Sequence, residues 1–126
     1  MRYSIKSAVA FGIIIAVAHA HADNKACLLE GSFKFAGKTT EIRDCLQNGG
    51  IDQKQFLEQC KGIAKIGAGL GAPPKVSYLG ACPANPLAVC EGMFGQPLAS
   101  YYYKRNAQDL ADAKSSCIAQ GGKWRA

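Results

Sequence analysis

Histidine is almost missing from this chain of 126 residues, which contains only His19 and His21. Both precede Asp23, the first acidic residue. If the N-terminus is cleaved beyond His21, the remaining protein has no imidazole for a Ser-His or Cys-His nucleophile pair or for a metal site. The nine acidic residues show no motif that places two carboxylates in one pocket. We therefore expect no enzymatic activity, no metal ion and no cofactor.

A hydrophobic run long enough to span a membrane is also missing. The apolar stretch over residues 8–18 is shorter than the roughly 20 residues that a bilayer requires. It follows Arg2 and Lys6 and precedes small residues in an A-x-A pattern, which is typical of an export signal. Cleavage fits this pattern after Ala18, Ala20 or Ala22. We favour Ala22, which predicts a signal peptide over residues 1–22 and no membrane span after its removal.

Two alternatives remain for the N-terminus. The segment can stay attached as an amphipathic anchor. Cleavage after Ala18 would instead expose His19-Ala20-His21, and a free amine with a histidine at the third position suits Cu(II) in a square plane. A copper-binding protein is therefore an alternative that depends on His19 and His21 alone.

Clusters of one charge sign are absent as well. The formal net charge is +6, and removal of Arg2 and Lys6 with residues 1–22 leaves +4 on a chain of 104 residues. The basic and acidic residues are interspersed, whereas a phosphate-binding surface requires clustered basic residues. We therefore expect one mildly cationic domain over residues 23–126 and no nucleic-acid partner.

The chain has six cysteines but no C-x-x-C pair of the kind that zinc sites use. All six follow the predicted signal peptide. An even number of cysteines in a small exported chain indicates disulfide bonds and an oxidising compartment. We expect the protein to be periplasmic or secreted.

The pattern of the first half predicts a strand and two helices. Period-two alternation over residues 23–36 indicates a half-buried strand. Ile42, Cys45 and Leu46 have helical spacing, and Gly49 would end that helix. A D-x-x-Q sequence over 52–55 predicts the start of a helix with Phe56, Leu57 and Cys60 inward. Residues 67–75 contain G-x-G-x-G, but they follow a helix and run into two prolines, so we read a connector and not a phosphate loop.

The second half reads as strands over about residues 75–80, 87–95 and 99–104, followed by a helix. Asn106 is placed to cap this helix and Gly121 to end it. Leu110, Ala113, Cys117 and Ile118 have the spacing of an inward face.

The phrase CLQNGG at residues 45–50 recurs as CIAQGG at residues 117–122. We interpret each as the end of a helix that a disulfide ties to a preceding strand. The sequence thus predicts an α+β, small disulfide-stapled domain of two similar strand–helix units, residues 23–66 and 76–126. The predicted pairs are Cys27–Cys45, Cys90–Cys117 and, between the units, Cys60–Cys82. Six cysteines allow 15 pairings, and a chance recurrence of the phrase is the alternative.

Residues 82–124 carry a C-P…C…Y-Y…C-x-x-x-G-G-x-W pattern. It resembles small cysteine-rich exported bacterial proteins of unassigned function. The resemblance covers about a third of the chain and implies export and cystine crosslinks, with no activity to transfer.

The segment SYYYKR over residues 100–105 is the candidate binding surface. Alternation along a strand would place Tyr101 and Tyr103 on one face beside Lys104 and Arg105, which suits recognition of a protein, peptide or glycan. The alternative is that tyrosines are present because they favour strands. Glu30 and Glu91, which follow cysteines in both halves, read as solvated strand positions.

The leading hypothesis is an exported, non-enzymatic, disulfide-stabilised protein that acts by binding an unknown partner. A secreted effector or toxin-like protein acting on another cell is the second hypothesis, because cationic charge and cystine crosslinks suit it equally well.

Overall fold

The structure, a computed structural model, describes residue 12 and residues 24–69 and 73–126. Except for residue 12, the predicted signal peptide therefore lies outside the described residues, and so do the two histidines. The elements are, in order, β1 (Ala26–Phe35), β2 (Lys38–Asn48), α1 (Gln53–Gly69), β3 (Lys75–Leu79), β4 (Ala88–Glu91), the 3-10 turn η1 (Met93–Gly95), β5 (Leu98–Tyr102), α2 (Ala107–Ala119) and β6 (Lys123–Arg125). No helix among the described residues is both long and apolar enough to cross a membrane.

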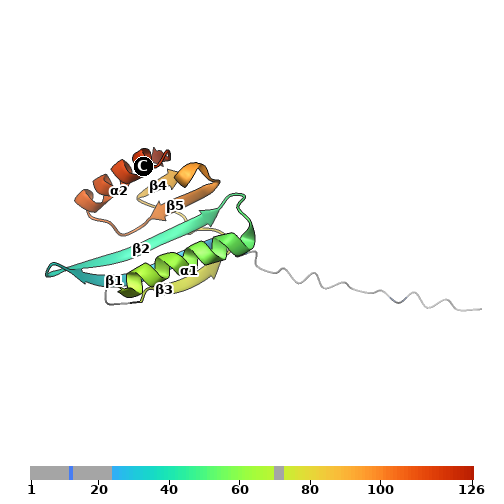
Figure 1. Ribbon diagram of the computed structural model, residues 1–126, viewed down its shortest axis with the longest axis horizontal. Helices are drawn as coiled ribbons and strands as arrows, with labels where there is room; N and C mark the ends of the chain where they lie inside the picture. The colour runs from blue at the N-terminus through green and yellow to red at the C-terminus, as the bar shows by residue number, and fades with distance from the viewer. Residues whose placement is uncertain (1–11, 13–23, 70–72) are drawn as a thin grey trace, which may run out of the picture.

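All six strands form one antiparallel sheet in the order β3-β1-β2-β5-β4-β6. Both helices cover the same face of this sheet (Figure 1). The core on that face contains Phe56 and Cys60 of α1 packed on Cys27, Leu46 and Leu98. A second, smaller core around Ala26, Leu28 and Cys45 lies on the opposite face. The α+β class and the disulfide-stapled architecture are thus as the sequence predicts.

The sheet contains two copies of one arrangement, a hairpin followed by a helix and a third strand. In the first unit Cys27 lies opposite Leu46 of β2 and Tyr78 of β3. In the second unit Cys90 lies opposite Ser100 of β5 and Trp124 of β6. Leu46 and Ser100, which occupy equivalent places, also lie opposite each other where β2 meets β5. An approximate two-fold axis therefore passes between these two residues, perpendicular to the sheet.

The boundary between the units differs from the predicted one. Strand β3 pairs with β1, so residues 75–79 complete the first unit in space and do not begin the second. Helix α1 also continues through Gly69, into the predicted connector. The chain passes from one unit to the other after Leu79.

The helix predicted around Ile42, Cys45 and Leu46 is wrong, because these residues lie in strand β2. Ala36 and Gly37 both have positive φ, of 51° and 79°, which is the backbone of a tight two-residue hairpin turn. This turn folds β2 back along the whole of β1. Cys45 and Leu46 are both buried because each face of the sheet is covered at this point, and that gives adjacent apolar residues without a helix.

The two predicted helix starts are confirmed. The Asp52 carboxylate accepts a hydrogen bond from the Gln55 backbone N–H at 3.2 Å, and the Asn106 side chain accepts one from the Asp109 N–H at 2.8 Å. These contacts satisfy N–H groups that the first helical turn leaves unpaired. On α2, however, only Cys117 is buried, and Ile118 is 57% exposed. The predicted inward face of α2 is therefore narrower than the spacing suggests.

Three disulfides connect the described cysteines, and none of those cysteines is free. The predicted Cys90–Cys117 bond is confirmed. The predicted Cys27–Cys45 and Cys60–Cys82 bonds are wrong, because Cys27 bonds Cys60 and Cys45 bonds Cys82. Cys45 lies opposite Leu28, so its side chain points away from the face on which Cys27 lies. The equivalent bonds of the two units are Cys27–Cys60 and Cys90–Cys117, each joining a first strand to its helix.

The repeated phrase proves to be a coincidence of sequence. In CLQNGG the glycines follow a strand, where the Asn48 side-chain oxygen accepts hydrogen bonds from the Gly50 and Ile51 N–H groups. In CIAQGG Gly121 has a φ of 83° and ends a helix. Gly122 then lies against the disulfide, since a Cβ atom on it would stand 2.8 Å from the sulfurs of Cys90 and Cys117. The two glycine pairs thus have different structural roles, one in the turn after a strand and the other at the end of a helix.

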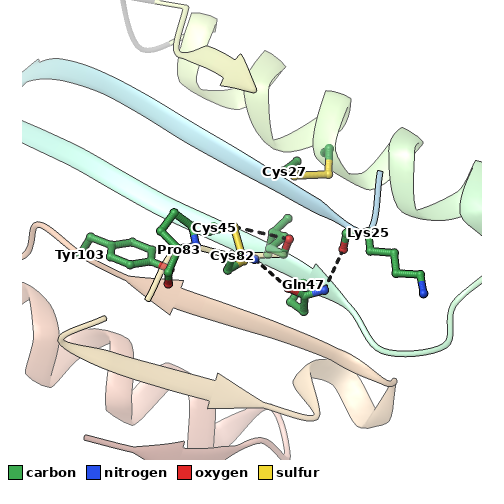
Figure 2. Close-up of a disulfide and its surroundings, with 9 residues drawn as sticks. Lys25, Cys27, Cys45, Gln47, Cys82, Pro83 and Tyr103 are labelled. Carbon is green, nitrogen blue, oxygen red and sulfur yellow. Dashed lines mark hydrogen bonds between the residues drawn. A yellow bond between two sulfur atoms is a disulfide. The ribbon is translucent and has the colours of Figure 1, made fainter. Parts of the chain in front are cut away.

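The segment between the units, residues 80–87, crosses the face of the sheet opposite the helices. Figure 2 shows Cys82 bonded to Cys45 of β2, with the Cys82 N–H donating to the Gln47 side-chain oxygen at 2.9 Å. The Tyr103 hydroxyl donates to the Pro83 carbonyl, and the Leu87 N–H donates to the Tyr102 carbonyl. The segment is therefore anchored to both units along its length.

Candidate functional site

The predicted binding residues Tyr101 and Tyr103 do not form an open surface. Both pack against the core around Cys45 on the face opposite the helices. The Arg43 guanidinium lies 5.0 Å from the centre of the Tyr103 ring. Burial raises the pKa of the Tyr103 hydroxyl above its ordinary value, although the Arg43 charge opposes this. These contacts give the two tyrosines a packing role, and a binding role for them stays a prediction.

Arg105 and Lys104 have acidic partners on β2. The Arg105 guanidinium forms an ion pair with Asp44 in which both side chains are largely buried. Burial raises the pKa of the Asp44 carboxyl, and the hydrogen bond and charge of Arg105 work against that rise. Lys104 contacts Glu41 at 3.7 Å and is well exposed. Arg105 thus holds the end of β5 against β2 and has its charge compensated. The predicted surface is not assembled as one patch.

The structure places the hollowed surface of the molecule elsewhere, on the helix face. An apolar groove of about 390 Å³ lies between α1 and the turn η1. Its floor is Leu46 and Leu98, the central residues of the helix-face core, and its walls include Ile63, Ile66 and Phe94. These three wall residues are among the exposed large apolar residues, with Ile66 67% exposed. Exposed apolar residues around one concavity are typical of a binding surface.

A second concavity of about 510 Å³, the acidic pocket, lies between η1 and α2. It is lined in part by Tyr102, Arg105, Asp109 and Asp112, with the Cys90–Cys117 disulfide among its walls. Burial lowers the pKa of the Arg105 guanidinium, whereas Asp44 and, less strongly, Asp109 raise it. The pocket is lined by two carboxylates, Asp109 and Asp112, and by the guanidinium of Arg105, which is already paired with Asp44.

Phe94, like Met93, lines both concavities. It is 59% exposed and has a φ of 57°, a left-handed conformation that is unfavourable for a bulky residue. The glycines on either side of the Met93-Phe94 pair, Gly92 and Gly95, also have positive φ, of 68° each. This short turn holds an aromatic ring in solvent at a cost of roughly 1 kcal/mol in backbone strain. Such strain is commonly kept where a residue has a function.

Gly62 is, after Phe94, a second residue that lines the apolar groove and makes the folded protein less stable. It lies within α1, where glycine costs about 0.5–1 kcal/mol relative to alanine. A Cβ atom on Gly62 would meet nothing within 4 Å, so no packing requirement explains the glycine. Because Gly62 lines the groove, an added side chain would reduce the volume of the groove. Gly67 of the same helix differs, because a Cβ atom there would stand 3.0 Å from the Pro74 ring.

Sequence reasoning missed both concavities, because they form between segments far apart in the chain. Two local signals exist nonetheless. One is an aromatic residue enclosed by glycines in Gly92-Met93-Phe94-Gly95, and the other is Gly62 inside a helical pattern. Neither is typical of a residue that only supports the core.

In residues 24–69 and 73–126 no group of three or more histidine, cysteine, aspartate or glutamate side chains is placed to hold a metal ion. The copper alternative depends on His19 and His21, which lie outside the described residues. Comparison with protein families, with curated proteins and with solved structures finds no match to this chain. The functional argument therefore depends on the geometry of the helix face.

Proposed function

We propose that this protein is an exported, non-enzymatic binding protein that holds a segment of a partner in the surface between α1 and α2, here called the helix-face trough. The trough consists of the apolar groove and the acidic pocket, which are both lined by Met93 and Phe94. Three disulfides in a chain of this size are consistent with an oxidising compartment. Export itself is supported by the N-terminal sequence pattern.

The observation that carries the proposal is Phe94. Burial does not explain an aromatic side chain that is more than half exposed, and its backbone conformation makes the free protein less stable. An aromatic ring displayed above an apolar floor is, in contrast, a common anchor at the centre of an interface. Gly62 supports the same conclusion independently, because it gives up helix stability on the opposite wall of the groove.

The test is a selection of random 12-residue peptides, displayed on phage, against the immobilised oxidised protein. Selected peptides are then synthesised and titrated into the wild type and the Phe94→Gly and Phe94→Ala variants. We expect both variants to weaken binding at least tenfold. Phe94→Gly removes the strain along with the ring, so its stability in urea should equal or exceed that of the wild type by up to about 1 kcal/mol.

Gly62→Ala tests the opposite wall of the groove. We expect a gain of about 0.5–1 kcal/mol in stability and a loss of affinity, because the added methyl group narrows the groove. Gly69→Ala is the matched control, since it lies at the end of the same helix with nothing within 4 Å of the added methyl group and does not line the groove. Binding that is unaffected by Phe94→Gly and Gly62→Ala would contradict the proposal.

A further inference from the structure

We infer that the occupant of the helix-face trough is a peptide segment that carries one large apolar side chain and, next to it, one lysine or arginine. The inference rests on the proposed function and specifies its ligand. The two concavities share Met93 and Phe94 as lining residues, so one short segment that passes over these residues can contact both. Each concavity accepts a different kind of side chain.

The apolar groove fits a leucine, methionine or aromatic side chain. No charged residue is among the described residues that line it, and Leu46 and Leu98 form a buried apolar floor. Burying such a side chain between this floor and the exposed walls Ile63, Ile66 and Phe94 would remove apolar surface on both partners from water, which favours binding. The groove therefore supplies affinity.

The acidic pocket fits the basic side chain. Asp109 and Asp112 line the pocket, the charge of Arg105 is compensated by its ion pair with Asp44, and no lysine is among the residues described as lining the pocket. A bound ammonium or guanidinium group would compensate the excess of negative charge. The Phe94 ring lines the same pocket and can add a cation–π contact.

An anionic membrane surface is the other partner that exposed apolar residues beside lysines can indicate. The lysines of α1, Lys54, Lys61 and Lys65, line neither concavity, and the carboxylates of α2 lie on the trough. A hollow surface with an acidic wall is poorly matched to a negatively charged bilayer. The charge distribution therefore favours the peptide.

The test uses acetylated, amidated hexapeptides of glycine and serine that carry one leucine or phenylalanine and one arginine at every spacing. Each has a matched analogue with glutamine in place of arginine. Affinities for the oxidised protein are measured by fluorescence polarisation. We expect the best arginine peptides to bind about tenfold more tightly than their glutamine analogues, and this preference to weaken as salt is added.

The variant Asp109→Asn/Asp112→Asn should abolish the preference for arginine and leave the affinity for the glutamine analogues unchanged. Glu41→Gln/Glu58→Gln, at two exposed positions that line neither concavity, is the matched control for net charge and should change neither affinity. Urea denaturation of both variants verifies that they remain folded.

The outcomes separate the inference from the proposed function. Peptides that bind in a manner sensitive to Phe94→Gly but with no preference for arginine would overturn the inference and leave the proposed function standing. No binding by any peptide, binding that is insensitive to Phe94→Gly, or binding only to vesicles of phosphatidylglycerol would overturn both.

Discussion

The two halves of the molecule share one arrangement but use it differently. In the first unit the hairpin strands are 10 and 11 residues long, and the hairpin extends beyond the rest of the sheet (Figure 1). In the second unit the strands have 4 and 5 residues, and the turn between them is η1, which carries Phe94. The long hairpin carries its turn away from the helices, whereas the short hairpin places its turn beside α1. A difference in strand length thus places Phe94 beside both concavities of the trough.

The helices differ in the same way. Helix α1 has 17 residues and buries Phe56, Cys60 and Gly67, whereas α2 has 13 residues and buries Cys117 alone. The first unit therefore holds its helix by packing and by a disulfide, and the second holds its helix chiefly by a disulfide. This comparison can be tested by removing each kind of contact in turn.

The largest effect is expected from Phe56→Ala. Phe56 is fully buried in the helix-face core, and removal of such a ring generally lowers the free energy of unfolding by about 3–5 kcal/mol. Leu110→Ala is the counterpart on α2, where the side chain is only half-buried, and we expect about 1 kcal/mol. Urea denaturation measures both. Equal losses would show that α2 is packed as firmly as α1.

The next effect concerns the equivalent disulfides. Their sequence separations of 33 and 27 residues predict similar losses, about 3–4 kcal/mol each, from restricting the unfolded chain. Local protection should differ. In Cys90→Ala/Cys117→Ala the amides of α2 should exchange with solvent far faster than the rest of the protein, whereas in Cys27→Ala/Cys60→Ala the amides of α1 remain protected through Phe56. Hydrogen exchange measures this, and equal protection of the two helices would remove the distinction.

A smaller effect separates two glycines of α1. Gly67→Ala should destabilise the protein by roughly 1–2 kcal/mol, because the added methyl group would press on Pro74 and Phe33. Gly62→Ala, one and a half turns earlier, should stabilise it as described above. Thermal unfolding of the two variants shows directly whether each substitution raises or lowers the stability of the protein. A loss of stability in both would mean that Gly62 is needed for folding and not for the groove.

The smallest effect is a pH dependence of the hydrogen bond between Tyr103 and Pro83 of the crossing segment. The folded-state pKa of Tyr103 is raised above the ordinary value of 10.0, so the stability it contributes is present below pH 10 and is lost as the pH rises through the folded-state pKa. The ionised oxygen can no longer donate to the Pro83 carbonyl. Tyr103→Phe should lower stability by about 1 kcal/mol at pH 8 and reduce the difference between pH 8 and pH 11. An unchanged difference would assign the alkaline loss to other groups.

Much of the fold could be predicted from the sequence where the signal is local. The period-two pattern of β1, the caps Asp52 and Asn106, and the helix end at Gly121 depend on residues close in the chain. The sequence pattern assigns Cys45 and Leu46 of β2 to a helix, because these two residues are buried on opposite faces and so imitate a helical spacing. The two-residue hairpin turn at Ala36 and Gly37 is hard to recognise in the sequence, because alanine rarely adopts positive φ.

The disulfide pairs show where local reasoning fails. The pairing of Cys90 with Cys117 follows from a strand and its helix, and the same rule applied to the true helix of the first unit gives Cys27–Cys60. The third bond, Cys45–Cys82, requires the path of residues 80–87 across the sheet, which no local pattern specifies. The trough could not be predicted from the sequence for the same reason, because its residues come from both units.

The crossing segment also determines how the molecule meets a ligand. Because Cys82 is covalently attached to β2 and the chain on either side of it is hydrogen-bonded to the sheet, the two units cannot hinge about this connection. The spacing between α1 and α2 is then set before any partner arrives. Association should proceed without closure of the protein, so that little conformational entropy is lost on its side and ligand discrimination depends on the fit to a preorganised surface.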